Sequence, residues 1–530
     1  MASKTTQALW QTKRIPLVHP AIYSTGRGVI SSTNSAPVNC AVLTVPGADD
    51  GNPQMFLTRR LGFGARTAVT GSPGTPVQDV ILASKGFASN GYFSIWGKSS
   101  STVHLVKNTA SHATFALGGG ATLLDASRIT ECLSGTTPAL LFHVSTTGGT
   151  RKLFFPEGGA ITEITDADLP SLQITGNFVY MNGYAFIMTK NGRIYNSDLN
   201  SLSSWSGSFI NAGLQNDLGV GLARYKDTIV AFSQNSIEFF RITDNPSGTP
   251  LVSIPSYGIA NMGCASGTDS STNWQSGHTY FEDTDTVYWI STRASMGPAI
   301  YHLDGFKATR LSDAFFEVNL RPVTSLINSS DPDPYRLEIT GLIMYNNEPV
   351  LLIRSFSTGA WETWAYFFKS KFFSKWMFAN NINSDEIIAS ISPIYSIIKT
   401  SINYGIVTMP TTLAGTVDDY YDNGSVVELR LPLPDVDFGT QNRKRCRKLK
   451  LIGVNGDGAS QAATTTTNIS WSDDGGVSFN TARTIDRFSS TRAYLSNCGT
   501  FRNRMFLIVD SSATPFEYSH LELDLILGSN

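Results

Sequence analysis

The stretch Phe178-Val-Tyr-Met-Asn-Gly-Tyr-Ala-Phe-Ile-Met188 consists of two apolar runs joined by Asn182-Gly183. A second turn pair, Asn191-Gly192, precedes a third run, Arg193-Ile-Tyr195. Asn-Gly supplies the positive φ angles of a two-residue hairpin turn. Short aromatic and β-branched runs between such turns are typical of antiparallel strands. The stretch therefore predicts a unit of strand, turn and strand.

Similar units recur along the middle of the chain. Their strand centres lie near positions 94, 142, 187, 230, 288, 351 and 406, a mean spacing of about 52 residues. A period of this order, with three or four strands per unit, is typical of a β-propeller, because a lone hairpin cannot bury both of its faces. A series of β-sandwich domains is the alternative. The uneven spacing leaves six and seven blades both open.

The composition of the 530 residues agrees with an all-β fold. Aromatic residues make up 11% and charged residues 15%, and the chain contains 46 Gly and 23 Pro. This combination favours strands joined by tight turns over long helices. The 40 Lys and Arg nearly balance the 42 Asp and Glu. The balance argues against a globally basic nucleic-acid binder and against an acidic disordered tail.

The cysteines and histidines point to neither a metal site nor a cofactor. The five cysteines are far apart, odd in number and outside any CxxC motif, which favours free thiols over zinc ligands or disulfides. The seven histidines form no HExxH or HxH pattern. No secretory or membrane-spanning apolar run occurs. We therefore expect synthesis in a cytosol, no membrane insertion and no catalytic residues.

The two ends of the chain differ from the middle. Residues 1–75 are irregular and rich in Gly and Pro, and we assign them to an N-terminal arm and docking segment. Residues 76–430 carry the propeller pattern. Residues 431–530 contain a further set of short apolar runs, which predicts a C-terminal β domain that serves as a docking platform.

One short motif raises the question of an enzyme. Ser472, Asp474, Gly476 and Phe479 fit the Asp-box pattern S-x-D-x-G-x-x-F, which is frequent in sialidases and other propellers. In those proteins the Asp oxygens accept hydrogen bonds from turn amides. A single copy predicts a structural turn, whereas a sialidase-like hydrolase would also need three arginines and a tyrosine around its substrate. The sequence contains no P-loop, Rossmann or G-x-S-x-G motif.

The densest charge lies at Arg443-Lys-Arg-Cys-Arg-Lys-Leu-Lys450. A strand with a solvated basic edge is one interpretation, a contact with an acidic partner is the second, and DNA phosphates are the third. We predict a protein interface at basic residues of this run and of the N-terminal segment: Arg59, Arg60, Arg66, Arg443, Lys444, Arg445, Arg447 and Lys448.

Three elements, in this order, resemble the tail hub or nozzle proteins of short-tailed bacteriophages, also called packaged-DNA stabilisation proteins. The first is a blade of the form Val-Tyr-x-Leu-x-Gly followed by Arg-Ile-Ser, to which residues 281–291 and 297–312 correspond. It follows a unit like Gln234–Ile242. The second element is the basic strand, followed by the Asp-box segment. The third element is Arg502–Phe506. The resemblance covers roughly residues 175–530.

The resemblance implies a structural virion protein of the phage tail. Such hubs form a homohexameric ring below the portal and its adaptor protein, extend the DNA channel, help to retain the genome and carry tailspikes or tail fibres. It further implies transient contact with double-stranded DNA in the lumen. The sequence departs from the family after the blade motif, where Arg310-Leu-Ser312 is followed by Asp-Ala-Phe-Phe-Glu317 in place of Thr-x-Ala-Ile-Glu. A receptor-binding adhesin and a glycan-processing propeller are the alternatives.

Overall fold

A computed structural model gives the fold of the chain. It describes residues 10–18, 36–45, 54–63, 67–68, 80–87, 91–97, 99–107, 110–169, 174–243, 248–265, 268–269, 274–275, 277–283, 285–293, 297–312, 317, 337–345, 348–357, 360–377, 386–390, 395–399, 404–408, 421–422, 425–454, 465–487, 493–512, 514 and 516–528. Within these ranges the regular structure is a series of β-strands and one short 3₁₀ segment, η1 (Pro255–Tyr257).

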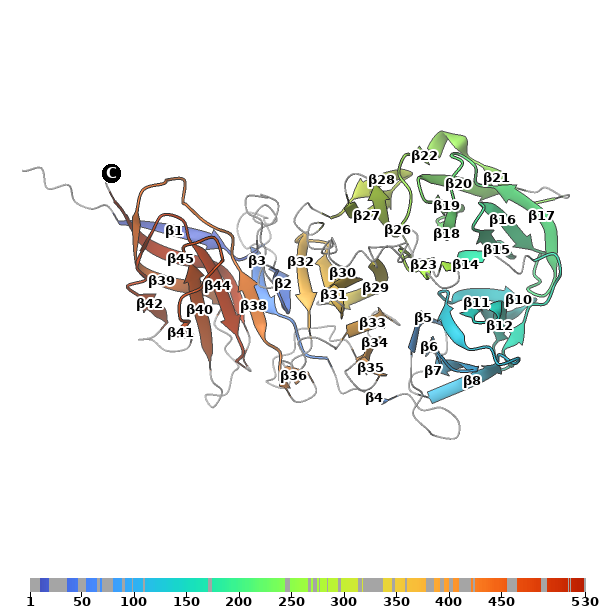
Figure 1. The fold of residues 1–530 in the computed structure, drawn as a ribbon, viewed down its shortest axis with the longest axis horizontal. Helices are drawn as coiled ribbons and strands as arrows, with labels where there is room; N and C mark the ends of the chain where they lie inside the picture. The colour runs from blue at the N-terminus through green and yellow to red at the C-terminus, as the bar shows by residue number, and fades with distance from the viewer. Residues whose placement is uncertain are drawn as a thin grey trace, which may run out of the picture.

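Seven antiparallel sheets are arranged around a common axis (Figure 1). Each is a blade, whose strands run in order from the axis outward. Blade 1 contains β5 (Val80–Phe87), β6 (Gly91–Trp96), β7 (Thr102–Lys107) and β8 (Ala110–Ala116). Blade 2 contains β9 (Leu123–Ala126) with β10 (Thr130–Ser134), then β11 (Thr137–Thr146), β12 (Gly149–Pro156) and β13 (Thr162–Glu163). Blade 3 contains β14 (Ile174–Met181), β15 (Tyr184–Thr189), β16 (Arg193–Ser197) and β17 (Trp205–Asn211).

The remaining blades follow the same plan. Blade 4 contains β18 (Gly219–Tyr225), β19 (Thr228–Ser233), β20 (Ser236–Ile242) and β21 (Leu251–Ser253), with β22 (Ile259–Ala260) also paired to β20. Blade 5 contains β25 (Tyr280–Glu282), β26 (Val287–Arg293), β27 (Gly297–Asp304) and β28 (Lys307–Arg310). Blade 6 contains β29 (Leu337–Tyr345), β30 (Glu348–Ser357), β31 (Ala360–Phe367) and β32 (Phe372–Trp376). Blade 7 contains β33 (Glu386–Ser390), β34 (Tyr395–Lys399), β35 (Tyr404–Thr408) and β4 (Thr67–Ala68).

The ring is closed by a strand from the other end of the sequence. β4 pairs with β35, so residues 67–68 supply the outermost strand of the last blade. The innermost strand of that blade, β33, contacts both β29 of blade 6 and β5 of blade 1. Closure leaves neither the first nor the last sheet with an uncovered face. The expectation of a β-propeller with an additional β domain is thus confirmed, and the described strands give seven blades.

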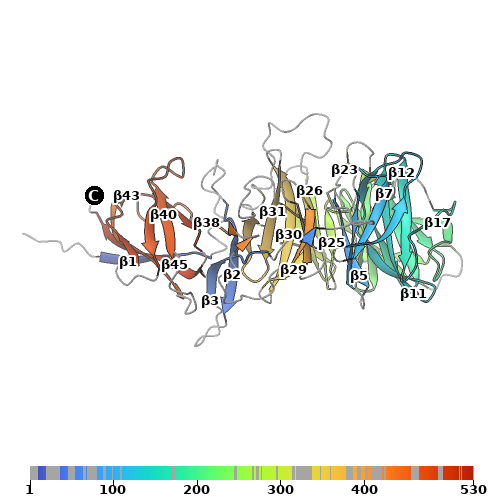
Figure 2. The ribbon, with the colours of Figure 1, turned by 90° about the horizontal axis from the view of Figure 1, so that it is seen from below.

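The additional domain is a β-sandwich at the other end of the molecule (Figures 1 and 2). One sheet has the order β2 (Cys40–Val45), β3 (Gln54–Arg59), β45 (Glu517–Leu527), β39 (Lys444–Val454) and β42 (Tyr494–Ser496); β1 (Trp10–Pro16) also pairs with β45, and β43 (Thr500–Phe501) with β39. The other sheet has the order β38 (Leu429–Pro432), β44 (Met505–Asp510), β40 (Thr466–Ser472) and β41 (Arg483–Asp486). Two further strands extend the sheet of blade 3: β24 (Trp274–Gln275) runs parallel to β14, and β23 (Thr268–Asp269) pairs with β24. A separate short pair, β36 (Tyr421–Asp422) with β37 (Ser425–Val426), completes the described strands.

The N-terminal segment, residues 1–75, is predicted from the sequence as a separate arm. In the structure β1 to β3 of that segment are strands of the sandwich, and β4 belongs to the propeller. Val38 bridges the two units, because it pairs with Lys375 of β32 in blade 6 on one side and with Arg430 of β38 on the other. The cores also merge, since one hydrophobic cluster contains Trp376 and Phe367 of blade 6 together with sandwich residues such as Phe506.

The two outer strands of blade 6, β31 and β32, are rich in aromatic residues. Tyr366 and Phe373 face the neighbouring blade 5, whereas Phe367 and Phe372 face the sandwich cluster. Alternate residues of a strand point to opposite faces of its sheet, so one aromatic-rich strand pair supplies two cores.

Gly176 provides a test of how closely the inner strands approach one another. Its φ is +72°, and a Cβ there would lie 2.6 Å from the hydroxyl of buried Tyr280 and against the backbone of Gly221. Gly135 has a similar φ, +64°, but open space around it. We expect Gly135→Ala to cost about 1 kcal/mol through backbone strain, and Gly176→Ala to cost at least about 3 kcal/mol because overpacking is added. Thermal unfolding measures both variants, and equal losses would contradict the close approach.

Candidate protein interface

The basic run predicted as an interface forms the start of β39. Successive side chains of this strand point to opposite faces of the sheet. Arg443, Arg445 and Arg447 are exposed, whereas Lys444 and Cys446 between them are buried. Cys446 belongs to the hydrophobic core of the sandwich. The arginines therefore stand on the outer face of the sheet, where another protein can contact them.

Lys444 has an internal role. Its Nζ donates hydrogen bonds to the backbone carbonyls of Thr440 (2.6 Å), Asn442 (3.0 Å) and Arg502 (2.6 Å). Burial lowers the pKa of this ammonium group, and the cage of carbonyl oxygens compensates for the water that it has lost. The structure thus places Lys444 where it holds the loop before β39 against the loop before β44.

The strand beside β39 carries acidic residues on the same outer face. The register of β39 and β45 sets Lys448 opposite Asp524 and Lys450 opposite Glu522. From the far side, Arg14 of β1 approaches Glu522, with Nε 3.3 Å from Oε2. Cross-strand pairing thus compensates the positive charge of Lys448 and Lys450 in this part of β39. Arg445 lies beyond these acidic residues, opposite Ile526, and it is exposed together with Arg443 and Arg447, two positions away on either side.

Lys448 also contacts an aromatic ring. Its Nζ lies 3.9 Å from the ring centroid of Tyr494 on β42, a cation–π contact at the edge of the sheet. Of the five basic residues predicted in this run, the structure therefore brings all five onto one strand or its first flanking residue. It leaves three of them exposed on the outer face.

The Asp-box residues form the hairpin turn between β40 and β41. Both carboxylate oxygens of Asp474 accept a hydrogen bond from the Ser478 amide, at 3.0 and 3.1 Å, and the Ser472 hydroxyl donates at 2.5 Å. The Gly476 amide in turn donates to the Ser472 hydroxyl at 2.8 Å. These hydrogen bonds hold the pKa of Asp474 well below its usual range. Phe479, the last residue of the motif, is half-buried. The carboxylate is fully occupied by its own turn.

The neighbouring acid fixes this hairpin to the rest of the sandwich. Asp473 forms a bidentate ion pair with the buried Arg504, at 2.6 and 2.7 Å. The guanidinium of Arg504 also donates to the carbonyl of Cys498 and lies 4.2 Å from the ring centroid of Phe501. Arg504 thereby connects the hairpin of one sheet with the strand beside β39 in the other sheet.

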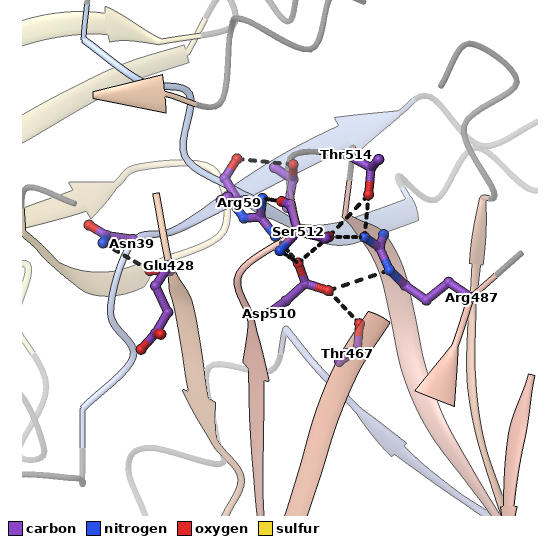
Figure 3. A network of polar contacts seen from close by, with 9 residues as sticks. Asn39, Arg59, Glu428, Thr467, Arg487, Asp510, Ser512 and Thr514 are labelled. Atoms are coloured by element: carbon purple, nitrogen blue, oxygen red, sulfur yellow. Dashed lines mark hydrogen bonds and ion pairs between the residues drawn. The ribbon is translucent and has the colours of Figure 1, made fainter. Parts of the chain in front are cut away.

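Arg59 and Arg60 are predicted at an interface, but the structure places both inside the chain, with no exposed surface. Arg59 forms an ion pair with Asp510 and donates to the carbonyl of Ser512 (Figure 3). Asp510 also faces Arg487, whose Nε lies 3.4 Å from Oδ2, and accepts a hydrogen bond from Thr467. The buried carboxylate of Asp510 thus interacts with the charges of two buried guanidinium groups, that of Arg59 at the end of β3 and that of Arg487 just after β41.

Arg60 lies at the junction of the two units. Its guanidinium donates to Asp422 (3.0 Å), to the side-chain oxygen of Asn39 (3.0 Å) and to the carbonyl of Met377 at the end of blade 6 (2.6 Å). Both arginines are therefore intrachain contacts, since buried groups leave no surface for another protein. Arg66 lies outside the described residues.

The axis of the propeller is crossed by polar side chains from opposite blades. Arg128, between β9 and β10, donates to the carbonyl of Ile339 in blade 6 and lies 5.1 Å from the ring centroid of Phe281 in blade 5. His278, which precedes blade 5, lies with Nε2 3.1 Å from the carbonyl of Ala126 in blade 2. Burial lowers the pKa of Arg128 to about 10. These contacts connect blade 2 with blades 5 and 6 across the middle of the ring.

The polar residues of the segment from Arg310 to Glu317, which follows the family-like blade motif, bind one another. Arg310 forms a two-point ion pair with Glu317, whose Oε1 lies 2.7 Å from Nε, and Ser312 donates to the same carboxylate at 2.5 Å. The Ser312 hydroxyl accepts the Ile300 amide at 2.9 Å. The three polar residues of the motif therefore anchor the chain that leaves blade 5, and the buried Glu317 needs both partners.

The acidic partners of the buried arginines and the residues on the axis could not be found from the sequence. Asp422 and Asp510 are separated from Arg60 and Arg59 by more than 350 residues, and no local pattern marks them. In the described part of the chain there is no cluster of His, Cys, Asp and Glu with the spacing of a metal site. Across the same residues, no helix has the length and hydropathy needed to span a bilayer.

Comparison with known proteins gives one family match. Residues 138–330 match the family described as Phage_stabilise, Bacteriophage P22 Gp10, beta-propeller. The matched segment begins in β11 and ends beyond β28, so it spans most of blade 2 and all of blades 3 to 5. The resemblance inferred from the sequence is confirmed by this match. No curated protein sequence matches the chain.

Three of the solved structures that resemble the chain have low sequence identity to it. Raptor of Chaetomium thermophilum has 9% identity and a TM-score of 0.40; the match covers 67% of this chain and 29% of that one, so the chain spans less than a third of Raptor. YCF48 bound to D1 peptide has 12% identity and a TM-score of 0.36, with 67% and 97% covered. An exo-β-1,3-galactanase of Phanerochaete chrysosporium has 6% identity and a TM-score of 0.27, with 88% and 100% covered.

Asp510 tests the buried arginine network. Asp510→Asn leaves the guanidinium groups of Arg59 and Arg487 buried without their carboxylate, and we expect the free energy of unfolding to fall by about 3–5 kcal/mol. Glu428→Gln is the matched control, because its pair with Arg430 is exposed and should contribute less than about 1 kcal/mol. Denaturant unfolding followed by tryptophan fluorescence compares them, and a similar loss in both variants would contradict the network.

The burial of His143 predicts that the folded propeller loses stability in acid. Its ring Nε2 lies 2.6 Å from the carbonyl of Gly176, and burial lowers its pKa to about 4 from the ordinary 6.5. Since the folded state disfavours the charged ring, stability is complete above pH 6.5 and is lost as the pH falls toward 4. The expected loss is about 3 kcal/mol. His143→Gln should remove this part of the pH dependence of the melting temperature, and identical pH profiles for both proteins would contradict the assignment.

Proposed function

We propose that this chain, whose residues 138–330 match the phage stabilisation family, is the subunit of a tail hub or nozzle in a short-tailed phage. The family match supports a structural protein of a phage tail, located in the virion, and suggests that the chain is not an enzyme. The finer assignment is a homohexameric ring that docks below the portal and its adaptor protein. There it extends the DNA channel, helps to retain the packaged genome and anchors tailspikes or fibres.

The match over blades 2 to 5 is the observation that carries the proposal. Rigidity of the described fold supports it. The ring is closed by β4, its axis is filled by Arg128 and His278, and its link to the sandwich is buried around Arg60. A structural ring that must hold against the pressure of packaged DNA needs subunits that keep their shape.

The filled axis bears on the path of the DNA. Arg128 reaches from blade 2 to blade 6, so the middle of the propeller is occupied by side chains. A lumen for DNA would therefore be formed between subunits of the ring. The net charge of −2 suits such a conduit, because a densely basic wall would bind phosphates through counterion release and slow the exit of the genome. Contact with double-stranded DNA would then be transient.

The outer face of β39 is the proposed contact with the adaptor ring. Arg443, Arg445 and Arg447 are exposed there, beyond the acidic residues of β45. Three arginines on one rigid strand suit an acidic partner surface, because guanidinium groups form paired hydrogen bonds with carboxylates. In this proposal the sandwich is the docking platform, and assembly takes place in the host cytoplasm without membrane insertion by this chain.

Charge reversal tests this contact. We expect Arg445→Glu with Arg447→Glu to leave the subunit folded, since both side chains are exposed, and to weaken binding to adaptor-capped portals by about tenfold or more, because like charges would then face each other. Co-sedimentation with the purified portal–adaptor complex and negative-stain images measure docking.

The matched control reverses two exposed lysines of the propeller, Lys226 and Lys307, and should dock normally. Normal docking by the arginine variant would remove the interface assignment. The images also show whether the subunits form a six-fold ring. A monomer with no affinity for the portal complex would contradict the proposal of a tail hub.

A further inference from the structure

Two of the five cysteines lie side by side in the sandwich. The amide of Cys498 donates a hydrogen bond to the carbonyl of Cys446 at 3.0 Å, and the amide of Cys446 donates to the carbonyl of Gly499 at 2.9 Å. Both cysteines are fully buried in the same hydrophobic core. The sequence places them 52 positions apart, and their spacing gives no sign of this pairing.

The backbone geometry of this pair suits a covalent link. The two cysteines lie in the irregular stretch between two ladders, that of Arg445 with Thr500 and that of Lys448 with Ser496. Their backbones are joined directly by the Cys498 amide, and their thiol groups are in hydrogen-bond contact with each other. Disulfides need Cα atoms about 4.4–6.8 Å apart, a range that neighbouring hydrogen-bonded backbones meet. Both side chains point into the one core, so their Cβ atoms lie on the same side of the sheet. Asn497, in the left-handed region with a φ of +54°, shapes the chain just before Cys498.

We infer that Cys446 and Cys498 are an oxidation site, at which a peroxide-class oxidant converts the two thiols into an intrachain disulfide. The link would join β39, the strand with the exposed arginines, to the segment between β42 and β43. It would close a loop of 52 positions that contains the Asp-box hairpin.

The surroundings of the two thiols assign their roles. Two positive charges lie beside Cys498, because Arg483 donates to the carbonyl of the preceding Asn497 at 3.3 Å and Arg504 is close by. The contact with Cys446 and these charges lower the pKa of Cys498, whereas burial raises it. Arg504 also donates to the Cys498 carbonyl, which holds its charge close by. Because the thiolate is the nucleophile, Cys498 is the cysteine that reacts first.

The chemistry then proceeds in two balanced steps. The sulfur of Cys498 attacks one oxygen of hydrogen peroxide, the O–O bond breaks, and a sulfenic acid and water form. The sulfur of Cys446 next attacks the sulfur of Cys498, the S–S bond forms, the S–O bond breaks, and the hydroxyl leaves as a second water with the proton of the Cys446 thiol. Two thiols are oxidised by two electrons and one peroxide is reduced.

Access for a small oxidant comes from the edge of the sheet. Cys498 follows β42, a three-residue strand at the end of its sheet, and Tyr494 on that strand is 39% exposed. Short edge strands open locally at low free energy. Cys446 and Cys498 also donate to carbonyls, those of Lys448 at 3.5 Å and Leu495 at 3.8 Å. The other three thiols make similar contacts with oxygens of Val38, Ala139 and Thr279, so the mutual contact of Cys446 and Cys498 is what distinguishes this pair.

The oxidation requires only this chain and a peroxide, but the setting in which it would take place rests on the proposed function. A virion protein made in a reducing host cytoplasm would keep both thiols and would meet oxidising conditions only after release. A disulfide formed then would stabilise the docking platform after assembly.

The test uses the full chain, purified under reducing conditions and treated with hydrogen peroxide. Free thiols are blocked before unfolding, and peptide mapping without reductant identifies linked cysteines. We expect a Cys446–Cys498 peptide, and a melting temperature of the sandwich that rises by about 5 °C or more on oxidation. Cys498→Ser keeps all ten methionines, so any effect of their oxidation appears in it as well.

A triple variant, Cys40→Ser with Cys132→Ser and Cys264→Ser, should still form the link and show the rise. Absence of the linked peptide from the folded wild-type protein, or the same shift in Cys498→Ser, would overturn the inference. Peptide mapping and melting are independent of docking onto the portal complex. A missing link would therefore leave the proposed hub standing, and a failure of docking would leave the disulfide standing.

Discussion

The buried guanidinium of Arg60 is the contact on which the relation between propeller and sandwich depends. It follows a strand of the sandwich, and its partners are Asn39 in the connecting segment, Asp422, and the carbonyl of Met377 at the end of blade 6. A buried charge that loses its partners costs several kcal/mol, so a hinge motion at this point would be opposed at once. Asn39 also accepts the Met377 amide and donates to the Glu428 carbonyl. Buried polar contacts thus join the two units at the junction.

The repeat of the propeller could be predicted because its signals are local. Asn182 and Gly183 have φ angles of +51° and +84°, as the hairpin turn between two apolar runs requires. The strand that closes the ring has no such signal. β4 is only two residues long, and its partner β35 lies more than 330 positions away. Likewise, β1 pairs with β45 at the opposite end of the sequence. Contacts of this kind are decided by the assembled fold, so composition alone assigns residues 1–75 to an arm.

The positions of the basic residues could be predicted only in part. The basic run was visible as a charge cluster, and the period of a strand explains why Arg443, Arg445 and Arg447 are exposed while Lys444 is buried. Arg59 and Arg60 carry the same kind of charge, but their carboxylate partners, Asp510 and Asp422, come from distant segments. A basic pair in the sequence cannot distinguish a solvated surface from a compensated interior. Burial of these arginines is a tertiary property.

The filled axis and the rigid junction together constrain the proposed assembly. Arg128 and His278 reach across the middle of the propeller, so in the proposed assembly the channel would be formed by the spaces between subunits. A heterologous ring requires each subunit to present two different surfaces at a fixed angle. Blade 6, the connecting segment and the sandwich are linked through Val38 and Arg60, so an angle set in one unit is transmitted to the other. A docking contact on β39 would then orient the whole propeller relative to the ring above.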